Sequence, residues 1–244
     1  MEKTVVIVGL SIIYVFDMLT ILQVGGSLAG LMNGIMLRHQ GYTVTILEQD
    51  PATSQRRSQA AGITPGPDFL KFMEKYDRTS RPISDGKFPM YICAKDGSAA
   101  KKLPVSFDYS SLGLLNSILR ANFDCHVSKA CPIPPEPIGG PGESIYLSGK
   151  CVTGVQFTGE KVLVQYTDVL SQSHDSIVSD LVIAADGSSS TIRNIIWPKV
   201  RRHYSGYVSW RGTVPESQVS VATSDYFDKC AKFFKHLPKG YMLV

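Results

Sequence analysis

The chain has 244 residues, with 25 Lys and Arg against 21 Asp and Glu, and a formal net charge of +4. This length suits one large domain or two small ones, and 43% hydrophobic residues allow a sizeable core. No basic block is interleaved with aromatic residues, and the five cysteines and five histidines are scattered without a C-x-x-C pair, so we expect no nucleic-acid-binding surface, disulfide framework or metal site.

The N-terminal part contains two candidates for the first strand. Val5 to Gly9 (VVIVG) read as a buried strand that ends in a glycine, and Gly25 to Leu31 read as a glycine-rich turn that opens a helix. Removing residues 10–25 would give an uninterrupted strand, turn and helix, so we interpret them as an insertion. Our hypothesis is a retained intron, which splice-site dinucleotides in the genomic DNA would test. In the alternative, Thr20 to Val24 form the first strand, and VVIV forms another strand or part of an apolar helix.

The apolar N-terminus also raises the question of a membrane. Residues 5–24 are mostly apolar but contain Asp17, and by length alone they are a marginal membrane-spanning candidate. No small-residue cleavage site of the usual kind follows them, which argues against a signal peptide. We therefore expect a cytoplasmic protein, with membrane association through residues 5–24 as the alternative.

The residues after Gly25 follow an α/β pattern. Apolar residues recur at helical spacing from Leu28 to Met36, Gly41 is a helix stop, and residues 42–48 (YTVTILE) alternate as a strand. Strand, glycine turn, helix and strand in this order form a βαβ unit, whose crossover makes the sheet parallel. The sequence therefore predicts an α/β fold.

Further patterns predict helices, strands and loops along the rest of the chain. The first are a short helix within 63–76, a hairpin over 87–107 with Asp96-Gly97 at its turn, and a helix over 110–123. A Pro/Gly-rich loop over 132–142 and an antiparallel meander over 144–168, with a turn at Gly159, follow. The last are a buried strand, turn and helix start over 179–196, a β-like stretch over 206–216, and the beginning of a strand in the final residues GYMLV.

The turn from Gly25 to Gly30 occupies the place of a dinucleotide fingerprint. In such a turn, glycines allow the tight bend, the approach of backbone to a pyrophosphate and close packing of the helix on the strand. The helix N-terminus offers N–H groups to the phosphates. Ser27 departs from the G-x-G-x-x-G pattern, and Glu48 ends the next strand, where a carboxylate can bind a ribose. The alternative is a glycine-rich turn of another α/β fold, with Glu48 in solvent.

A second signature is DLVIAADGSSSTIR, residues 180–193. Leu181 to Ala185 are apolar and deliver Asp186 to the carboxyl end of a buried strand, where open α/β sheets bind their ligands. Gly187 allows a turn, and the serines begin a helix. A carboxylate here would bind sugar hydroxyls; the alternative is a simple Asp-Gly turn.

Together, GGSLAGL, TVTILE, AAGI, DLVIAADGSSSTIR and GYVSWRGTVPE resemble FAD-dependent aromatic-ring monooxygenases of the 2,6-dihydroxypyridine and salicylate hydroxylase-like branch. The resemblance implies a Rossmann-like FAD-binding domain, with a parallel sheet and an antiparallel meander, over residues 1–85 and 109–200. It implies an incomplete β-rich substrate domain over residues 86–108 and 201–244.

The resemblance also implies a set of cofactor-binding residues, some of which keep an alternative. The pyrophosphate would lie on Gly25, Gly26, Ser27, Leu28, Ala29 and Gly30, the adenosine ribose on Glu48, and the rest of FAD close to Arg57 (or Arg56), Arg120, Asp186, Gly187 and Arg193. Asp186 would also lie near the path of the nicotinamide nucleotide. Each of the arginines Arg56, Arg57 and Arg120 is otherwise a solvated surface charge. Trp210 and Arg211 are substrate-site candidates, although a packed core tryptophan and a rim arginine are the favoured interpretation.

The reaction that the resemblance implies uses NADH or NADPH, FAD and O2 to hydroxylate a small aromatic or heteroaromatic substrate. The protein would supply orientation and a dry cavity, so no Ser/His/Asp or Cys/His constellation is required. Family members are longer, with a further flavin-contacting GD segment, so we expect this chain to be a fragment with weak or absent FAD binding and poor solubility when expressed alone.

Three other functions stay open at the level of the sequence. The first is a non-catalytic FAD- or nucleotide-binding fragment of such an enzyme. The second is a pyridine-nucleotide dehydrogenase, which would share the glycine turn but gives no reason for DLVIAADGSSSTIR. The third is a membrane-anchored interaction protein.

Overall fold

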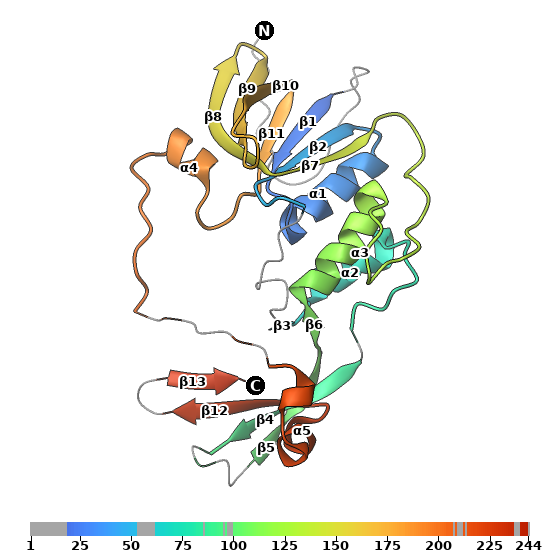
Figure 1. Ribbon diagram of the computed structural model, residues 1–244, viewed down its shortest axis with the longest axis vertical. Helices are drawn as coiled ribbons and strands as arrows, with labels where there is room; N and C mark the ends of the chain where they lie inside the picture. The colour runs from blue at the N-terminus through green and yellow to red at the C-terminus, as the bar shows by residue number, and fades with distance from the viewer. Residues whose placement is uncertain are drawn as a thin grey trace.

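The computed structural model describes residues 19–52, 62–84, 86–94, 96, 100–206, 208, 212, 214–236 and 240–243. Within these ranges, Figure 1 shows an α/β part, in which helices lie beside sheets, and a separate sheet below it.

A four-stranded parallel sheet forms the centre of the α/β part. Its order is β11 (Leu181–Ala184), β1 (Thr20–Val24), β2 (Thr43–Glu48) and β7 (Ser144–Ser148). Val24, the last residue of β1, pairs with Leu47 of β2 and with Ala184 of β11. Because all three strands run in the same direction, their carboxyl ends meet at one edge of the sheet, which is where ligands of open α/β sheets bind.

Three helices cover one face of this sheet. They are α1 (Leu28–His39), which connects β1 to β2, α2 (Pro67–Tyr76) and α3 (Leu112–Asp124). The core beneath them is built from apolar side chains that are almost completely buried: Ile21, Leu31, Ile35, Val44, Ile46, Ile118, Leu119 and Phe123. A Cβ on Gly34 would lie 3.0 Å from the ring of Phe123, so this glycine allows α1 and α3 to pack closely.

An antiparallel sheet covers the other face. It has the order β10 (His174–Ser179), β9 (Lys161–Asp168) and β8 (Lys150–Thr158). Val152, Val164 and Tyr166 of this sheet pack with Leu22, Val24 and Leu47 of the parallel sheet and with Ile192 of α4 (Thr191–Ile196). The parallel sheet is therefore the middle layer, with both faces buried (Figure 1).

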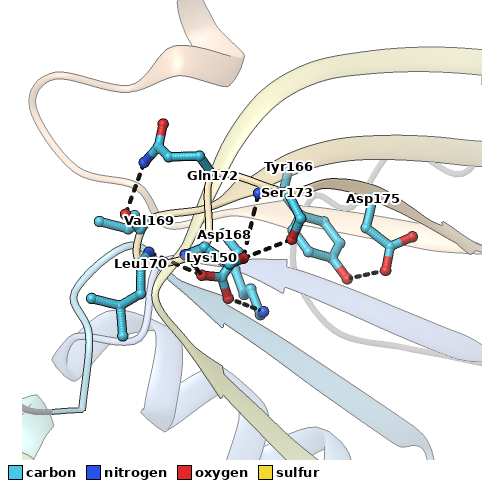
Figure 2. Close-up of polar contacts among 9 residues, drawn as sticks. Lys150, Tyr166, Asp168, Val169, Leu170, Gln172, Ser173 and Asp175 are labelled. Carbon is cyan, nitrogen blue, oxygen red and sulfur yellow. Dashed lines mark hydrogen bonds and ion pairs between the residues drawn. The ribbon is translucent and has the colours of Figure 1, made fainter.

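Polar contacts close the turn between β9 and β10, as Figure 2 shows. The carboxylate of Asp168 pairs with Lys150 and accepts a hydrogen bond from the N–H of Leu170 at 2.9 Å. The hydrogen bond from Lys150, together with those from the backbone, holds the pKa of the Asp168 carboxyl well below its usual range. Tyr166 donates its hydroxyl proton to Asp175 at 3.2 Å. These contacts fix the turn of the outer sheet.

A second four-stranded sheet lies apart from these layers (Figure 1). Its order is β13 (Gly240–Leu243), β12 (Ala231–His236), β4 (Lys87–Cys93) and β5 (Ala100–Asp108). The short pair β3 (Gly62–Ile63) and β6 (Ser110–Ser111), the 3-10 turn η2 (Glu216–Gln218) and helix α5 (Val221–Phe227) complete the described elements. The sheet thus combines strands from residues 86–108 and 201–244, although the division of the chain into two domains stays a prediction.

Most of the predicted elements are confirmed. The helices expected within 28–36, 63–76 and 110–123 correspond to α1, α2 and α3, and β4 pairs with β5 as the expected hairpin. Gly159, at a φ of +66°, forms the predicted turn between the antiparallel strands β8 and β9. The strand that enters the glycine turn is Thr20–Val24, which was the alternative; Val5 to Gly9 lie outside the described residues.

Three predictions are corrected. β7 was expected to open an antiparallel meander, but it pairs in parallel with β2, opposite residues 44–48. β11 was expected to be a buried strand, but it lies at the edge of its sheet and its residues are half-buried or exposed. Within residues 206–216, the described positions 206, 208, 212 and 214–216 belong to no strand, and the other positions lie outside the described residues. In the described part of the chain, no helix has both the length and the apolar character needed to cross a membrane.

Candidate functional site

The glycine turn begins where β1 ends. Gly25 has a φ of +105°, in the left-handed region that favours glycine, and its N–H donates to the carbonyl of Leu47 at 2.8 Å. A Cβ on Gly25 would lie 2.3 Å from the carbonyl oxygen of Ala185, and a Cβ on Gly30 would lie 1.9 Å from the carbonyl oxygen of Gly25. Both positions therefore require glycine, one for the tight bend and the other for close packing of the helix on the turn.

The N-terminus of α1 follows directly after this turn. Ser27 is the N-cap residue, its side chain makes no capping hydrogen bond, and the first turn of α1 contains no acidic residue. Its carbonyl accepts the N–H of Leu31 at 2.9 Å, so the helical pattern starts there. Since no side chain of its own neutralises this end of the helix, its N–H groups suit an anion such as a phosphate.

Glu48 holds its carboxylate beside the turn. Oε2 accepts the N–H of Gly26 at 2.8 Å, and Oε1 accepts the N–H of Asp50 at 2.9 Å. An ionised carboxylate has about four acceptor positions, so each oxygen keeps capacity for a further donor such as a sugar hydroxyl. The residue predicted to bind a ribose is thus tied directly to the predicted pyrophosphate turn.

Arg120 approaches the turn through Tyr146, a residue that the sequence analysis missed. The guanidinium carbon of Arg120 lies 3.5 Å from the centroid of the Tyr146 ring, and Asp124 binds the same guanidinium at 2.9 and 2.7 Å. The Tyr146 hydroxyl donates to the carbonyl of Gly26 at 3.1 Å. Burial, and next the negative charge of Glu48, raise the pKa of this phenol well above its usual value, so it stays a hydrogen-bond donor.

Asn116 is the second missed residue, and it donates through Nδ2 to the same carbonyl at 3.3 Å. Tyr146 could have been found if residues 144–148 had been placed in the parallel sheet, because its register opposite Ile46 brings it next to the strand that ends at Glu48. Asn116 carries no comparable signal in the sequence.

The loop after β11 lies beside the glycine turn. Ala185 donates its N–H to the carbonyl of Val24 at 2.7 Å, and a Cβ on Gly25 would lie 3.0 Å from the nitrogen of Asp186. Asp186 accepts the N–H of Ile192 at 3.2 Å through Oδ2. The two signatures that the sequence places more than 150 residues apart therefore meet at one edge of the sheet.

Arg193 turns back onto this second loop. Its guanidinium donates to the carbonyl oxygens of Gly187 at 3.4 Å and Ser188 at 2.6 Å. Its backbone N–H donates to Ser190 Oγ at 2.9 Å, and that hydroxyl caps α4. The side chain thus fixes the shape of the Asp186-Gly187 loop.

The remaining predicted site residues cannot be placed. Arg56, Arg57, Trp210 and Arg211 lie outside the described residues. Within the described residues, no group of three or more His, Cys, Asp and Glu side chains could hold a metal ion. All five cysteines are free thiols.

Comparison with known proteins shows similarity to monooxygenases along most of the chain. It is 26% identical over 218 residues to a 6-hydroxynicotinate 3-monooxygenase from Pseudomonas fluorescens, covering 86% of this chain and 51% of that protein. It is 25% identical over 209 residues to a 2,6-dihydroxypyridine 3-monooxygenase from Paenarthrobacter nicotinovorans, covering 84% of this chain and 45% of that protein. The chain therefore spans about half the length of these curated relatives, and the expected resemblance is confirmed.

The fold is shared with a solved enzyme structure. The 2,6-dihydroxypyridine-3-hydroxylase from Arthrobacter nicotinovorans superimposes with a TM-score of 0.69 at 20% sequence identity, covering 93% of this chain and 55% of the enzyme. A family model described as FAD binding domain-like matches residues 204–244. The expected α/β fold of FAD-binding type is confirmed.

Proposed function

We propose that the glycine turn binds the pyrophosphate of FAD, and that this chain supplies the dinucleotide-binding part of an FAD-dependent monooxygenase. The observation that carries the proposal is the close contact between Gly25 and the Ala185-Asp186 peptide. A Cβ on Gly25 would lie only 2.3 Å from the carbonyl oxygen of Ala185. This contact sets the two loops at the carboxyl ends of β1 and β11 around the uncapped start of α1. The family model that matches residues 204–244 supports FAD as the dinucleotide.

The residues of the turn fit such a ligand. Gly25 and Gly30 leave no room for a side chain, so the backbone from residue 27 to 30 can present its N–H groups directly to a pyrophosphate. Glu48 would accept the ribose hydroxyls. Arg120, which is paired with Asp124, would act through Tyr146, on whose ring it stacks. We assign Arg57 to the same ligand from its place before AAGI.

The loop after β11 would bind another part of the cofactor. Asp186 and Gly187 lie at the end of the strand, and Arg193 holds the loop carbonyls in place. When bound, FAD would supply the redox and oxygen chemistry, with NADH or NADPH as reductant. The protein would contribute orientation and the exclusion of water.

The substrate would be a small aromatic or heteroaromatic ring, as the names of the relatives suggest. We propose that residues 1–85 and 109–200 form the FAD-binding domain, and that residues 86–108 and 201–244 form part of the substrate domain. The separate sheet of β4, β5, β12 and β13 supports this division. Five free cysteines support a reducing compartment such as the cytoplasm.

Two titrations test the proposal on the full 244-residue chain. The first follows flavin fluorescence during addition of FAD, and the second follows NADH and NADPH oxidation with 6-hydroxynicotinate or 2,6-dihydroxypyridine. We expect Glu48→Gln to weaken FAD binding about tenfold, since a hydrogen bond to a charged group contributes about 1.5 kcal/mol or more. The exposed Glu74→Gln is the matched control and should bind as the wild type does.

Each result has a distinct meaning. FAD binding together with substrate-dependent NAD(P)H oxidation supports the monooxygenase. FAD binding without turnover supports the second candidate, a non-catalytic FAD-binding fragment. Weak FAD binding agrees with the proposal, since the chain spans about half the length of its relatives. A folded chain, judged by circular dichroism, that shows no affinity for FAD contradicts the proposal.

A further inference from the structure

The carbonyl group of Gly26 receives two side-chain hydrogen bonds from distant parts of the chain. Tyr146, on β7, donates its hydroxyl at 3.1 Å, and Asn116, on α3, donates Nδ2 at 3.3 Å. Neither donor is a neighbour of Gly26 in sequence, and both reach it at the start of the helix that follows the turn. We propose that Tyr146 and Asn116 are positioning residues, which orient the Gly26-Ser27 peptide group so that it can bind the pyrophosphate.

Both polar backbone groups of Gly26, its N–H and its carbonyl, form hydrogen bonds. Its N–H donates to Glu48 at 2.8 Å, and its carbonyl accepts the two side-chain donors. The Tyr146 oxygen lies only 2.1 Å from the position that a Cβ on Gly26 would take, so the phenol packs directly on the Cα. Only glycine leaves space for this contact, and the peptide groups on both sides of it are therefore fixed.

The orientation of the next N–H follows from the planarity of the peptide bond. In a trans peptide the carbonyl and the following N–H point in opposite directions. Because the Gly26 carbonyl is turned toward Tyr146 and Asn116, the N–H of Ser27 is turned away from them. Ser27 is exposed and occupies the N-cap position of α1 without a capping hydrogen bond, so its N–H joins those of the first helical turn as a donor to an anion.

Tyr146 is itself held in place. The Arg120 guanidinium stacks on its ring at 3.5 Å, and Asp124 fixes that guanidinium with two hydrogen bonds. The side chains of Arg120 and Asp124 are only 15% and 16% exposed, so solvent weakens this arrangement little. A chain of contacts thus runs from α3 through Tyr146 to the peptide group of the turn.

This inference rests on the proposed function, because it assumes that the Gly26-Ser27 peptide group binds a pyrophosphate. The test compares ADP, which carries the pyrophosphate, with adenosine, which lacks it, by calorimetric titration of the full chain. Tyr146→Phe keeps the ring beneath Arg120 and removes only the donor. We expect it to weaken ADP binding by about three- to tenfold and adenosine binding by less than about twofold, which corresponds to one hydrogen bond.

The matched control is Tyr166→Phe. Tyr166 also donates one hydrogen bond from its hydroxyl, to Asp175, but it lies in the outer sheet. We expect this variant to leave the ratio of the ADP and adenosine affinities unchanged. Asn116→Ala removes the second donor and should lower the same ratio, which provides a second measurement if Tyr146→Phe does not fold.

The ratio separates a positioning role from a purely structural one. Equal weakening of ADP and adenosine in both variants, or no weakening of either ligand, overturns the inference while FAD binding by the wild type still supports the proposed function. If the folded wild type binds neither FAD nor ADP, the proposed function fails and this inference fails with it.

Discussion

Gln23 lies in the middle of β1 with a completely buried side chain. Within the described part of the chain, neither its Oε1 nor its Nε2 has a hydrogen-bond partner. The amide packs against the start of α1, where a Cβ on Gly30 would lie 3.0 Å from Nε2. A buried polar group without a partner costs about 1–3 kcal/mol, so this residue weakens the strand that leads into the glycine turn.

We predict that Gln23→Met raises the free energy of unfolding by about 1–3 kcal/mol, because methionine has a similar shape and no amide to desolvate. Urea denaturation followed by circular dichroism measures the change. Gln49→Met, at an exposed position next to Glu48, is the control and should stay within about 0.5 kcal/mol of the wild type. A loss of stability in Gln23→Met would show that the amide is satisfied in the folded protein.

The residues of the turn differ in how far the sequence could reveal them. Gly25 and Gly30 were predictable, because the backbone of a strand–turn–helix connection needs glycine at those positions whatever surrounds them. Glu48 was predictable from its place at the end of the next strand. Tyr146 and Asn116 were not, because their contact with Gly26 depends on which strand and helix pack beside the turn.

Among the elements, α1 is tied to the Pro/Gly-rich loop by Arg38. The side chain is 3% exposed, and its guanidinium donates to the carbonyls of Ile138 at 3.0 Å and Pro141 at 2.9 Å and to Ser144 Oγ at 3.0 Å. A planar guanidinium can reach several acceptors at once, whereas a lysine ammonium cannot reproduce that geometry. The loop therefore depends on one buried cation.

We predict that Arg38→Lys lowers the free energy of unfolding by about 2–4 kcal/mol, since at least one buried hydrogen bond to a charged group is lost. The variant should also be cleaved faster within residues 132–142 during limited proteolysis. The control is Arg81→Lys, at an exposed position, which should change stability by less than about 0.5 kcal/mol. Wild-type stability in Arg38→Lys would contradict this role.

Asp180 connects the beginning of β1 to the outer sheet. Its carboxylate accepts the N–H and the hydroxyl of Thr20 at 2.8 and 2.7 Å and pairs with Lys161 on β9. Burial raises the pKa of this carboxyl, but the hydrogen bonds from Lys161 and Thr20 outweigh that effect and lower the pKa to about 2. A carboxyl with a lowered pKa stabilises the fold above its unfolded pKa, near 4, and loses that contribution as the pH falls toward about 2.

We predict that the free energy of unfolding decreases as the pH is lowered from about 4 to about 2. In Asp180→Asn this decrease should be smaller, because the contribution of the Asp180 carboxyl is absent. The variant should be less stable than the wild type at pH 7 and closer to it at pH 2. Urea denaturation at these pH values measures both effects. The exposed Asp225→Asn serves as the control and should follow the wild-type profile, whereas an unchanged profile in Asp180→Asn would contradict the prediction.

Among the secondary-structure elements, those with strong local periodicity could be predicted from the sequence. Strands whose place depends on the strand that they pair with could not. The helices α1, α2 and α3 and the strand β2 follow from spacing that is visible within each segment. β7 was assigned to the wrong sheet because its pattern is compatible with either neighbour, and its parallel pairing with β2 spans about 100 residues of sequence. β10 was missed because HDSIVS is largely polar and exposed.

For the molecule as a whole, the site depends on which segment occupies the position of β1. This strand pairs with both β2 and β11, so it connects the two loops that meet at the site. The sequence from Val5 to Gly9 has the same pattern as the sequence from Ile21 to Gly25, with Ile7 in the place of Gln23. The chain therefore carries two sequences that suit this central position, and the described strand is the one that buries an unpaired amide.

We predict that a variant lacking residues 10–25, in which Gly9 is joined directly to Gly26, folds with the same sheet and is more stable than the full chain by about 1–3 kcal/mol. The reason is that Ile7 would fill the position of Gln23 without burying an amide, while Gly9 would replace Gly25 at the bend. Urea denaturation and FAD titration measure stability and binding, and binding should be at least as tight as in the full chain. The same deletion with Ile7→Gln is the matched control, because it restores the amide and should lose the gain. If the deletion variant fails to fold while the full chain folds, residues 20–24 are required for the sheet, and an insertion at residues 10–25 is no longer a tenable interpretation.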